Sequence, residues 1–201
     1  MEGIYFYWIA WCLWIGVTFI MQKSNRRTFL SYFLLLLIIW AGFAVKLPIG
    51  ELSPAYLMLL LAGFGMAAHY RMNGLKLMLC SMGLGAGYAG LKLMQLYDPV
   101  WFTISPAGIL LIVCFCAAGV LGKLVFEKLP VFLIGCCTGE LLYEIIIYPI
   151  SGSVQIGQPA FLDFILFGAA GFTFWGLLKG IGLSFSTFLQ KPGKAKQSNN
   201  A

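Results

Sequence analysis

Two glutamates within one apolar run are the residues of this chain whose types and spacing best suit chemistry. Glu140 and Glu144 lie in the segment 135–148, whose other residues are mostly apolar. Four residues apart on a helix, their side chains share one face. A carboxyl group at membrane depth is costly unless it is paired, protonated or turned toward the protein interior. The pair therefore predicts a polar site inside a membrane-spanning segment.

A stripe of polar residues follows another apolar run, at 75–96. Its members recur at helical spacings: Ser81, Tyr88, Lys92 and Gln95. Counted back from the predicted outer ends of the two helices, Lys92 and Glu144 lie level, each about four residues or roughly 6 Å below the membrane boundary. We therefore predict an ion pair between Lys92 and Glu144. Glu140 then lies one turn deeper and lacks a basic partner.

Together these side chains define one candidate intramembrane polar cluster, which consists of Glu140, Glu144, Lys92, Tyr88, Tyr143 and Ser81. Two roles for it stay open. A closed clamp would fix the arrangement of the helices. Alternatively, burial would favour the protonated form of Glu140, which a proton-coupled carrier could use. A Glu140 sealed by packing favours the clamp, whereas a water-filled cavity that reaches Glu140 favours the carrier.

The composition places these residues in lipid. Of the 201 residues, 61% are hydrophobic and only 10% are charged, with a mean hydropathy of +0.90. That leaves too little polar surface to cover a water-soluble globule. At about 20 residues per crossing, the predicted fold is an all-α, polytopic transmembrane bundle over residues 1–189, with a polar basic cytoplasmic tail at 190–201. Its seven predicted helices are 3–21, 28–45, 54–70, 75–96, 106–121, 129–148 and 159–178.

The basic residues predict the orientation of the bundle. With seven crossings, all of the 13 Lys and Arg residues except Lys46 and Lys92 fall on the side of the C-terminus. Connections on the cytoplasmic side of a membrane are enriched in Lys and Arg. We therefore expect a multi-pass protein of the cell membrane, with its N-terminus outside and its C-terminus inside.

A pattern of prolines recurs in the three outward connections. Three prolines are predicted to end helices and three to begin the next ones, the latter at spacings of 52 and 53 residues: Pro48, Pro99 and Pro149, then Pro54, Pro106 and Pro159. Proline suits both positions. The pattern fits a helical-hairpin repeat, and it equally fits the ordinary length of a two-helix unit.

Glycines on the run 75–96 predict close helix packing. Gly83, Gly87 and Gly90 share one helix face. Small residues let a second helix backbone approach closely, which is a main source of helix association in lipid. Gly135 and Gly139 have the same four-residue spacing. We therefore expect a tightly packed bundle.

Motifs for other chemistry are missing from the sequence. The six cysteines all lie in apolar runs without a Cys-x-x-Cys pair, and the single histidine, His69, fits a capping or interfacial role at the end of the run 54–70. No hydrolase or nucleotide-binding motif occurs. Asp163, in the first turn of the run 159–178, suits the positive end of its own helix dipole and could face the same outer side as Glu144. We predict no catalytic, cofactor-binding or metal-binding residue.

The opening residues Met-Glu-Gly-Ile-Tyr-Phe-Tyr-Trp-Ile-Ala-Trp, the length of about 200 and the Ser-Pro-Ala connections resemble the small YphA-type membrane proteins of Bacillus and related spore-formers. The resemblance covers the whole chain in general character and carries no functional residue. It implies a cell-membrane protein connected with assembly of the spore envelope. The sequence thus predicts a non-enzymatic protein with a structural or assembly role in the cell envelope. Its partners would be the lipid bilayer and other membrane or envelope proteins, not nucleic acid. The alternative is a small proton-coupled transporter or channel with Glu140 as its titrating group.

Overall fold

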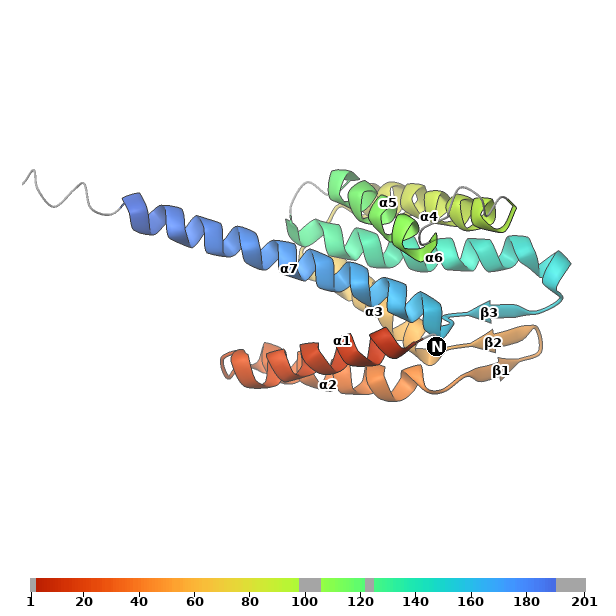
Figure 1. Ribbon diagram of the computed structural model, residues 1–201, viewed down its shortest axis with the longest axis horizontal. Coiled ribbons are helices and arrows are strands. Elements are labelled where there is room, and N and C mark those ends of the chain that lie inside the picture. Colours follow the sequence, from red (N-terminus) through yellow and green to blue (C-terminus); the bar gives the residue numbers. More distant parts are fainter. Residues whose placement is uncertain (1–2, 98–105, 122–124, 191–201) are drawn as a thin grey trace, which may run out of the picture.

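The computed structural model describes residues 3–97, 106–121 and 125–190, which fold mainly into helices. The helices in these ranges are α1 (Ile4–Ile15), α2 (Asn25–Ala41), α3 (Pro54–His69), α4 (Gly74–Tyr97), α5 (Pro106–Leu121), α6 (Val125–Ser151) and α7 (Pro159–Gln190). A π-helical segment, η1 (Gly16–Ile20), continues α1. The helices run side by side along the long axis of the molecule, and the far half of α7 extends beyond the others (Figure 1).

Helix α6 occupies the centre of the bundle. It packs against α3, α4, α5 and α7, and its contact with α4 is the most extensive between any two elements. Every residue from Pro130 to Cys137 is buried. A helix that is apolar on all sides has no face suited to water, so it lies in the interior of the bundle. The segment that carries Glu140 therefore passes through the core.

A small sheet covers one end of the bundle (Figure 1). Strands β1 (Val45–Leu47) and β2 (Gly50–Leu52) pair antiparallel, and β2 pairs parallel with β3 (Val154–Ile156). At Gly50 a Cβ atom would lie 1.9 Å from the Val154 carbonyl oxygen, so the pairing requires glycine there. The sheet joins the connection between α2 and α3 to the one between α6 and α7.

The sheet was not predicted, and two helices end differently from the prediction, α2 and α6. Helix α2 ends at Ala41 rather than at residue 45, because Val45 begins strand β1. Pro48 lies in the turn between β1 and β2, and Pro149 lies inside α6, so neither ends a helix as predicted. A proline near the end of a helix is tolerated in a bundle when neighbouring groups satisfy the freed backbone carbonyl.

The predicted helix starts at Pro54 and Pro159 agree with the starts of α3 and α7. Ser53 is the N-cap residue of α3, but its side chain makes no capping hydrogen bond. Helix α7 continues to Gln190, twelve residues beyond the predicted end at 178. Pro99, which was predicted to end a helix, and the predicted tail beyond Gln190 lie outside the described residues.

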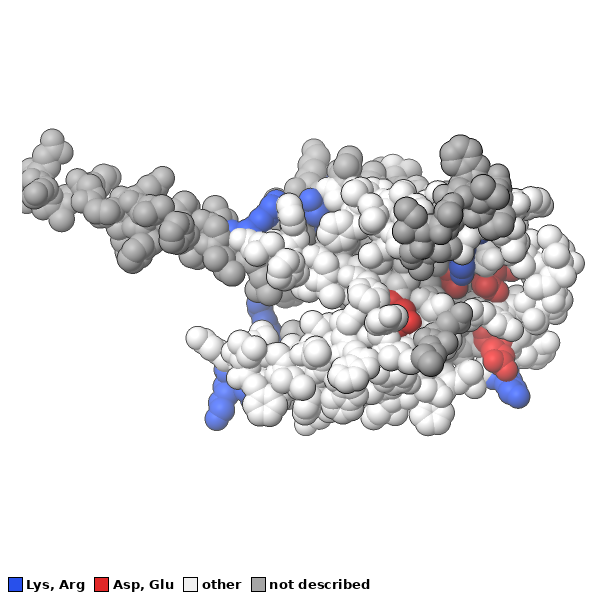
Figure 2. Space-filling view, in the orientation of Figure 1, with Lys and Arg blue, Asp and Glu red and all other residues white. Residues whose placement is uncertain are grey.

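Three described segments are long and apolar enough to cross a membrane by length and composition: Gly74–Tyr97, Lys128–Ser151 and Pro159–Gly176. Shorter apolar helices occupy Ile4–Ile20, Pro54–His69 and Gly108–Gly119. The acidic atoms visible in Figure 2 lie in the half of the molecule that carries the sheet, whereas basic atoms appear at both ends. The end that carries the sheet is called the sheet end below.

Candidate intramembrane polar cluster

The cluster forms where α4 and α6 approach most closely. A Cβ atom at Gly85 would lie 2.9 Å from the carbonyl oxygen of Gly135, and one at Gly139 would lie 2.7 Å from the carbonyl oxygen of Gly85. No real side chain fits such gaps, so the two backbones touch at these glycines. This contact fixes the register of the two helices. It places Tyr88, one turn further along α4, against Gly139.

The predicted packing face of α4 was wrong. A Cβ atom at Gly83, Gly87 or Gly90 would lie more than 4 Å from every described atom outside its own helix turn. All three glycines are exposed. The glycine that contacts α6 is Gly85, which lies on another side of α4. The predicted tight contact at Gly135 and Gly139 is confirmed.

Glu140 is the centre of the cluster, and it has a basic partner. Its Oε2 atom accepts hydrogen bonds from Lys92 Nζ at 2.6 Å and from the Tyr88 hydroxyl at 2.8 Å. The residue is 0% exposed. The predicted ion pair between Lys92 and Glu144 was therefore wrong, and so was the prediction of a partnerless Glu140. Helical side chains lean toward the N-terminus of their helix, so the long lysine stem reaches the deeper carboxylate.

Two aromatic rings enclose the Lys92 ammonium. Its Nζ atom lies 4.3 Å from the centroid of the Tyr143 ring and 5.8 Å from that of Tyr88. Cation–π attraction adds to the ion pair where water is excluded. The Lys92 side chain keeps 25% of its surface exposed, so the ion pair lies at the edge of the α4–α6 contact.

Glu144 binds the sheet instead of a lysine. Its Oε2 atom accepts a hydrogen bond from the backbone N–H of Gln155 at 2.8 Å, and the residue is 7% exposed. Gln155 is the central residue of β3. A buried carboxylate on α6 therefore holds the strand that follows this helix. Glu144 also lies within electrostatic reach of Glu140 and Lys92.

One atom of the cluster lacks a partner. The Oε1 atom of Glu140 is buried and makes no hydrogen bond with any group in the described residues. A buried acceptor without a donor is uncommon in native proteins and costs about 1–3 kcal/mol. The second oxygen of Glu140 is thus available to a small donor.

Ser81 does not belong to the cluster. Its hydroxyl donates to the Met78 carbonyl oxygen of its own helix, at 3.1 Å. Sequence reasoning instead missed Tyr56, whose buried hydroxyl donates to the carbonyl oxygen of Cys137 at 2.8 Å. This bond ties the first turn of α3 to α6 one turn below Glu140. The sequence carries no signal for it, because a tyrosine near a helix end equally fits a membrane-interface position.

Asp163 has a partner that the sequence did not predict. Its carboxylate accepts hydrogen bonds from the backbone N–H groups of Gly3, at 2.8 Å, and of Phe6. Both donors belong to the unsatisfied first turn of α1. Asp163 thus caps the N-terminus of a different helix, rather than only interacting with the dipole of its own. Gly3 has a φ of +92°, which suits glycine at this entry.

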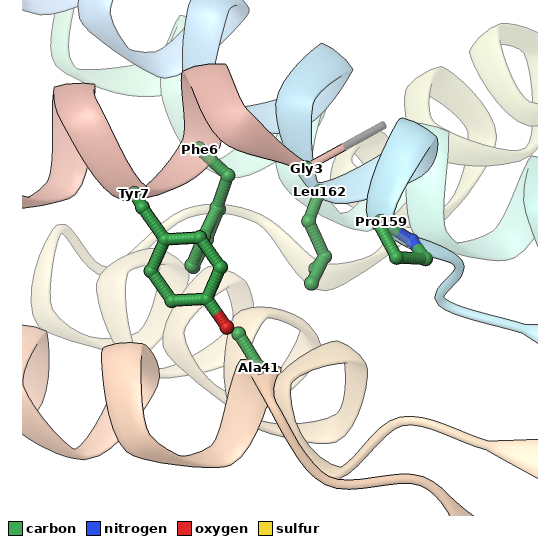
Figure 3. A pocket seen from close by; sticks show the side chains of 6 residues that line it. All are labelled: Gly3, Phe6, Tyr7, Ala41, Pro159 and Leu162. Atoms are coloured by element: carbon green, nitrogen blue, oxygen red, sulfur yellow. The ribbon is translucent and has the colours of Figure 1, made fainter. Parts of the chain in front are cut away.

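Two cavities near these groups are small. One of about 70 Å³ lies beside the start of α1 and is lined by Gly3, Phe6, Tyr7, Ala41, Pro159 and Leu162 (Figure 3). The other, of about 90 Å³, lies between α4 and α5 beside Gly83, Gly87 and Tyr88. Neither is lined by Glu140. Pockets for metabolites usually measure about 300–1,000 Å³, so each of the two has room only for a few water molecules.

The contacts of the cluster join elements of the bundle to one another. In the described ranges no group of three His, Cys, Asp or Glu residues could hold a metal ion. Glu140 faces a lysine and a tyrosine, and neither of the two cavities described above is lined by it. What this arrangement can do is join α4, α6 and the sheet, and bind a proton.

Comparisons with known proteins agree with a membrane location. The sequence of residues 2–198 matches the family described as "YphA-like integral membrane protein". One relative, the protein of Bacillus subtilis (strain 168) named "Uncharacterized protein YphA", is 37% identical over 166 residues, which cover 81% of each chain. No solved structure matches.

Proposed function

We propose, for a chain that belongs to the YphA-like integral membrane protein family, that the polar cluster is a structural clamp in a non-enzymatic component of the cell envelope. The observation that carries this proposal is the complete burial of Glu140 between Lys92 and Tyr88. A group that served a transport pathway would need contact with water on at least one side. The clamp joins two helices whose backbones already touch.

The proposed topology keeps seven crossings of the cell membrane, with the sheet end outside. Helices α1, α6 and α7 support it, because the starts of α1 and α7 and the end of α6 lie at the sheet end. The 32 residues of α7 span roughly 48 Å. This exceeds the hydrocarbon thickness of about 30 Å, so α7 would extend into the cytoplasm together with the lysines of the tail.

The orientation is testable by labelling single cysteines introduced at exposed positions on the two ends. Glu51, in strand β2, and Arg26, at the start of α2, are exposed. In intact cells an impermeant thiol reagent should label Glu51→Cys and spare Arg26→Cys, in a background whose native exposed cysteines are replaced. The opposite labelling pattern would reverse the proposed orientation. Labelling of both cysteines would show that the two positions do not lie on opposite sides of the membrane.

The clamp is testable with two substitutions at Glu140. A glutamine keeps an oxygen that can accept from both Tyr88 and Lys92, whereas a leucine leaves both donors without a partner. We expect Glu140→Gln to accumulate in the membrane at near the normal level and Glu140→Leu to accumulate poorly. Equal accumulation of the two would count against a clamp.

The alternative, a proton-coupled carrier, predicts a different result. In liposomes that enclose a pH-sensitive dye, a carrier that uses Glu140 would conduct protons, and Glu140→Gln would abolish the flux. We expect the purified protein to give no more flux than protein-free liposomes. Flux that is lost in Glu140→Gln, with normal accumulation of this variant, would establish the carrier.

A role in spore-envelope assembly stays a prediction from the family resemblance. Deleting the gene in its native host should leave vegetative growth unchanged and lower the resistance of spores if this role is correct. Normal resistance of spores would leave the clamp intact and remove the sporulation link.

A further inference from the structure

We propose that the cluster is a proton-binding site that holds one proton at neutral pH, carried by Glu144 and donated to the free Oε1 atom of Glu140. The proposal starts from a charge count. Two buried carboxylates, Glu140 and Glu144, stand beside a single ammonium, Lys92. With both acids ionised the cluster would hold one uncompensated negative charge at membrane depth, which is costly.

Among the described residues, the neighbouring elements supply no second cation. The titratable groups that face the two carboxylates are Lys92 and Tyr88 of α4, Tyr143, Cys136 and Cys137 of α6, and Tyr56 of α3. Among these described groups only Lys92 is basic. Strand β3 contributes a backbone N–H, and α5 contributes Cys114, which faces Tyr88. A proton is the simplest species that neutralises the cluster.

The hydrogen bonds indicate which acid carries the proton. Glu140 has an ammonium at 2.6 Å and a phenol at 2.8 Å on one oxygen, and both stabilise its ionised form. Glu144 has one neutral backbone donor. Because ionised Glu140 is favoured more strongly, the proton resides on Glu144.

The unpartnered oxygen supplies the acceptor for this proton. Glu140 and Glu144 are four residues apart on α6, where side chains lie about 5–6 Å apart at Cβ and can meet at their ends. A protonated Glu144 donates its O–H to Glu140 Oε1, while its carbonyl oxygen keeps the bond from Gln155. The proton comes from water and returns to water, so no other reactant is needed. Two buried groups of like charge thereby share one proton.

The site couples protonation to structure on both sides of Glu144. Loss of the proton would place two ionised carboxylates on adjacent turns of α6, one bound to α4 and the other to the sheet. Repulsion between them would loosen the contact between α6 and β3, since Lys92 already binds Glu140. The inference rests on the clamp proposed above, but the two can fail separately. Accumulation of the variants tests the clamp, and spectroscopy tests the proton.

The experiment is infrared spectroscopy of the full-length protein, purified in a zwitterionic detergent at pH 7, with and without ¹³C-labelled glutamate. A protonated glutamate gives a C=O stretching band that is separate from the carboxylate bands and shifts with the label. We expect the wild-type protein to show this band. Glu144→Gln and Glu140→Gln should each remove it, because each leaves one carboxylate beside one lysine. Glu51→Gln, a substitution on the exposed strand β2, is the matched control and should keep it.

Lys92→Met tests the charge count itself. Without its cation the cluster should bind a second proton, so the band should double in intensity. The absence of the band in the wild-type protein, its survival in Glu144→Gln, or an unchanged intensity in Lys92→Met would each overturn the proposal. The wild-type measurement needs no variant, so the proposal stays falsifiable even if a substitution prevents folding.

Discussion

Glu140 and Asp163 are both acidic residues on the helices of one bundle, yet they are satisfied in different ways. Glu140 is bound by the side chains of Lys92 and Tyr88. Asp163 is bound by the main chain at the start of α1, through the N–H groups of Gly3 and Phe6. The first arrangement depends on two particular side chains. The second depends only on where a helix begins.

This difference teaches how each contact responds to substitution. Substitution of Lys92 removes the cation that pairs with Glu140, so the cluster then needs a second proton to stay neutral, whereas the N–H groups that bind Asp163 are lost only on substitution by proline. Conversely, the loss of Asp163 leaves unsatisfied backbone donors that water can reach at the helix end. The α4–α6 contact should therefore be the more sensitive of the two. The predictions below test this ranking, in order of decreasing effect.

Lys92→Leu should have the largest effect. Breaking a buried ion pair by removing one partner typically costs about 3–5 kcal/mol, and the partial exposure of Lys92 places the expected loss at the lower end of this range. The double variant Lys92→Leu/Glu140→Leu should recover much of the loss, because an apolar pair needs no compensation. Unfolding in detergent, followed by circular dichroism, measures both. A double variant less stable than Lys92→Leu would contradict the clamp.

Asp163→Ala should have a smaller effect, of about 2 kcal/mol. It removes two hydrogen bonds to a charged acceptor, but the freed N–H groups at the start of α1 can bind water, as at a lost helix cap. Asp163→Asn keeps an acceptor oxygen and should lose less. Hydrogen exchange at the first turn of α1 reports the change locally. An effect of Asp163→Ala larger than that of Lys92→Leu would reverse the ranking.

Gly85→Ala should cost about 1–3 kcal/mol, since the added methyl group meets backbone atoms of α6. Gly87→Ala is the matched control on the same helix. A Cβ atom there meets nothing within 4 Å, so alanine should leave stability unchanged or raise it slightly. The melting temperatures of the two variants in the same detergent separate them. Equal destabilisation by both would mean that the face of α4 that carries Gly87 also packs against another helix.

The glycines of α4 and α6 also show what the sequence could not decide. Gly83 and Gly87 are related to Gly135 and Gly139 by an offset of 52 residues, the same as that between Pro54 and Pro106. The pattern is alike, yet the first pair is open and the second is packed. Periodicity indicates which residues share a face of a helix. It does not indicate which neighbour that face meets, because that depends on the arrangement of the whole bundle.

The approximate positions of the helices and the existence of a polar cluster were predictable from the sequence, but the partners of the polar residues were not. Apolar runs set the approximate positions of the helices, and the chemistry of Glu, Lys and Tyr indicated a cluster. Depth counting then compared Cα positions and missed the lean of the Lys92 side chain toward Glu140. The partner of Asp163 and the sheet were missed because their donors are main-chain groups, which every residue except proline carries. Such bonds leave little trace in the sequence.

Glu144→Gln should have the smallest effect at neutral pH, below about 1 kcal/mol. The amide oxygen can still accept from the Gln155 N–H, and the amide nitrogen can donate to Glu140 in place of the proton. The difference from the wild-type protein should grow as the pH rises. A proton bound more tightly in the folded state than in the unfolded state contributes stability that is lost when it dissociates, so the wild-type protein should weaken at alkaline pH. Glu144→Gln has no such proton to lose and should keep its stability, measured by unfolding between neutral and alkaline pH. A parallel decline of both proteins would mean that another group controls the pH dependence. Glu140 would then differ from Asp163 only in its ion pair with Lys92, and not also in a shared proton.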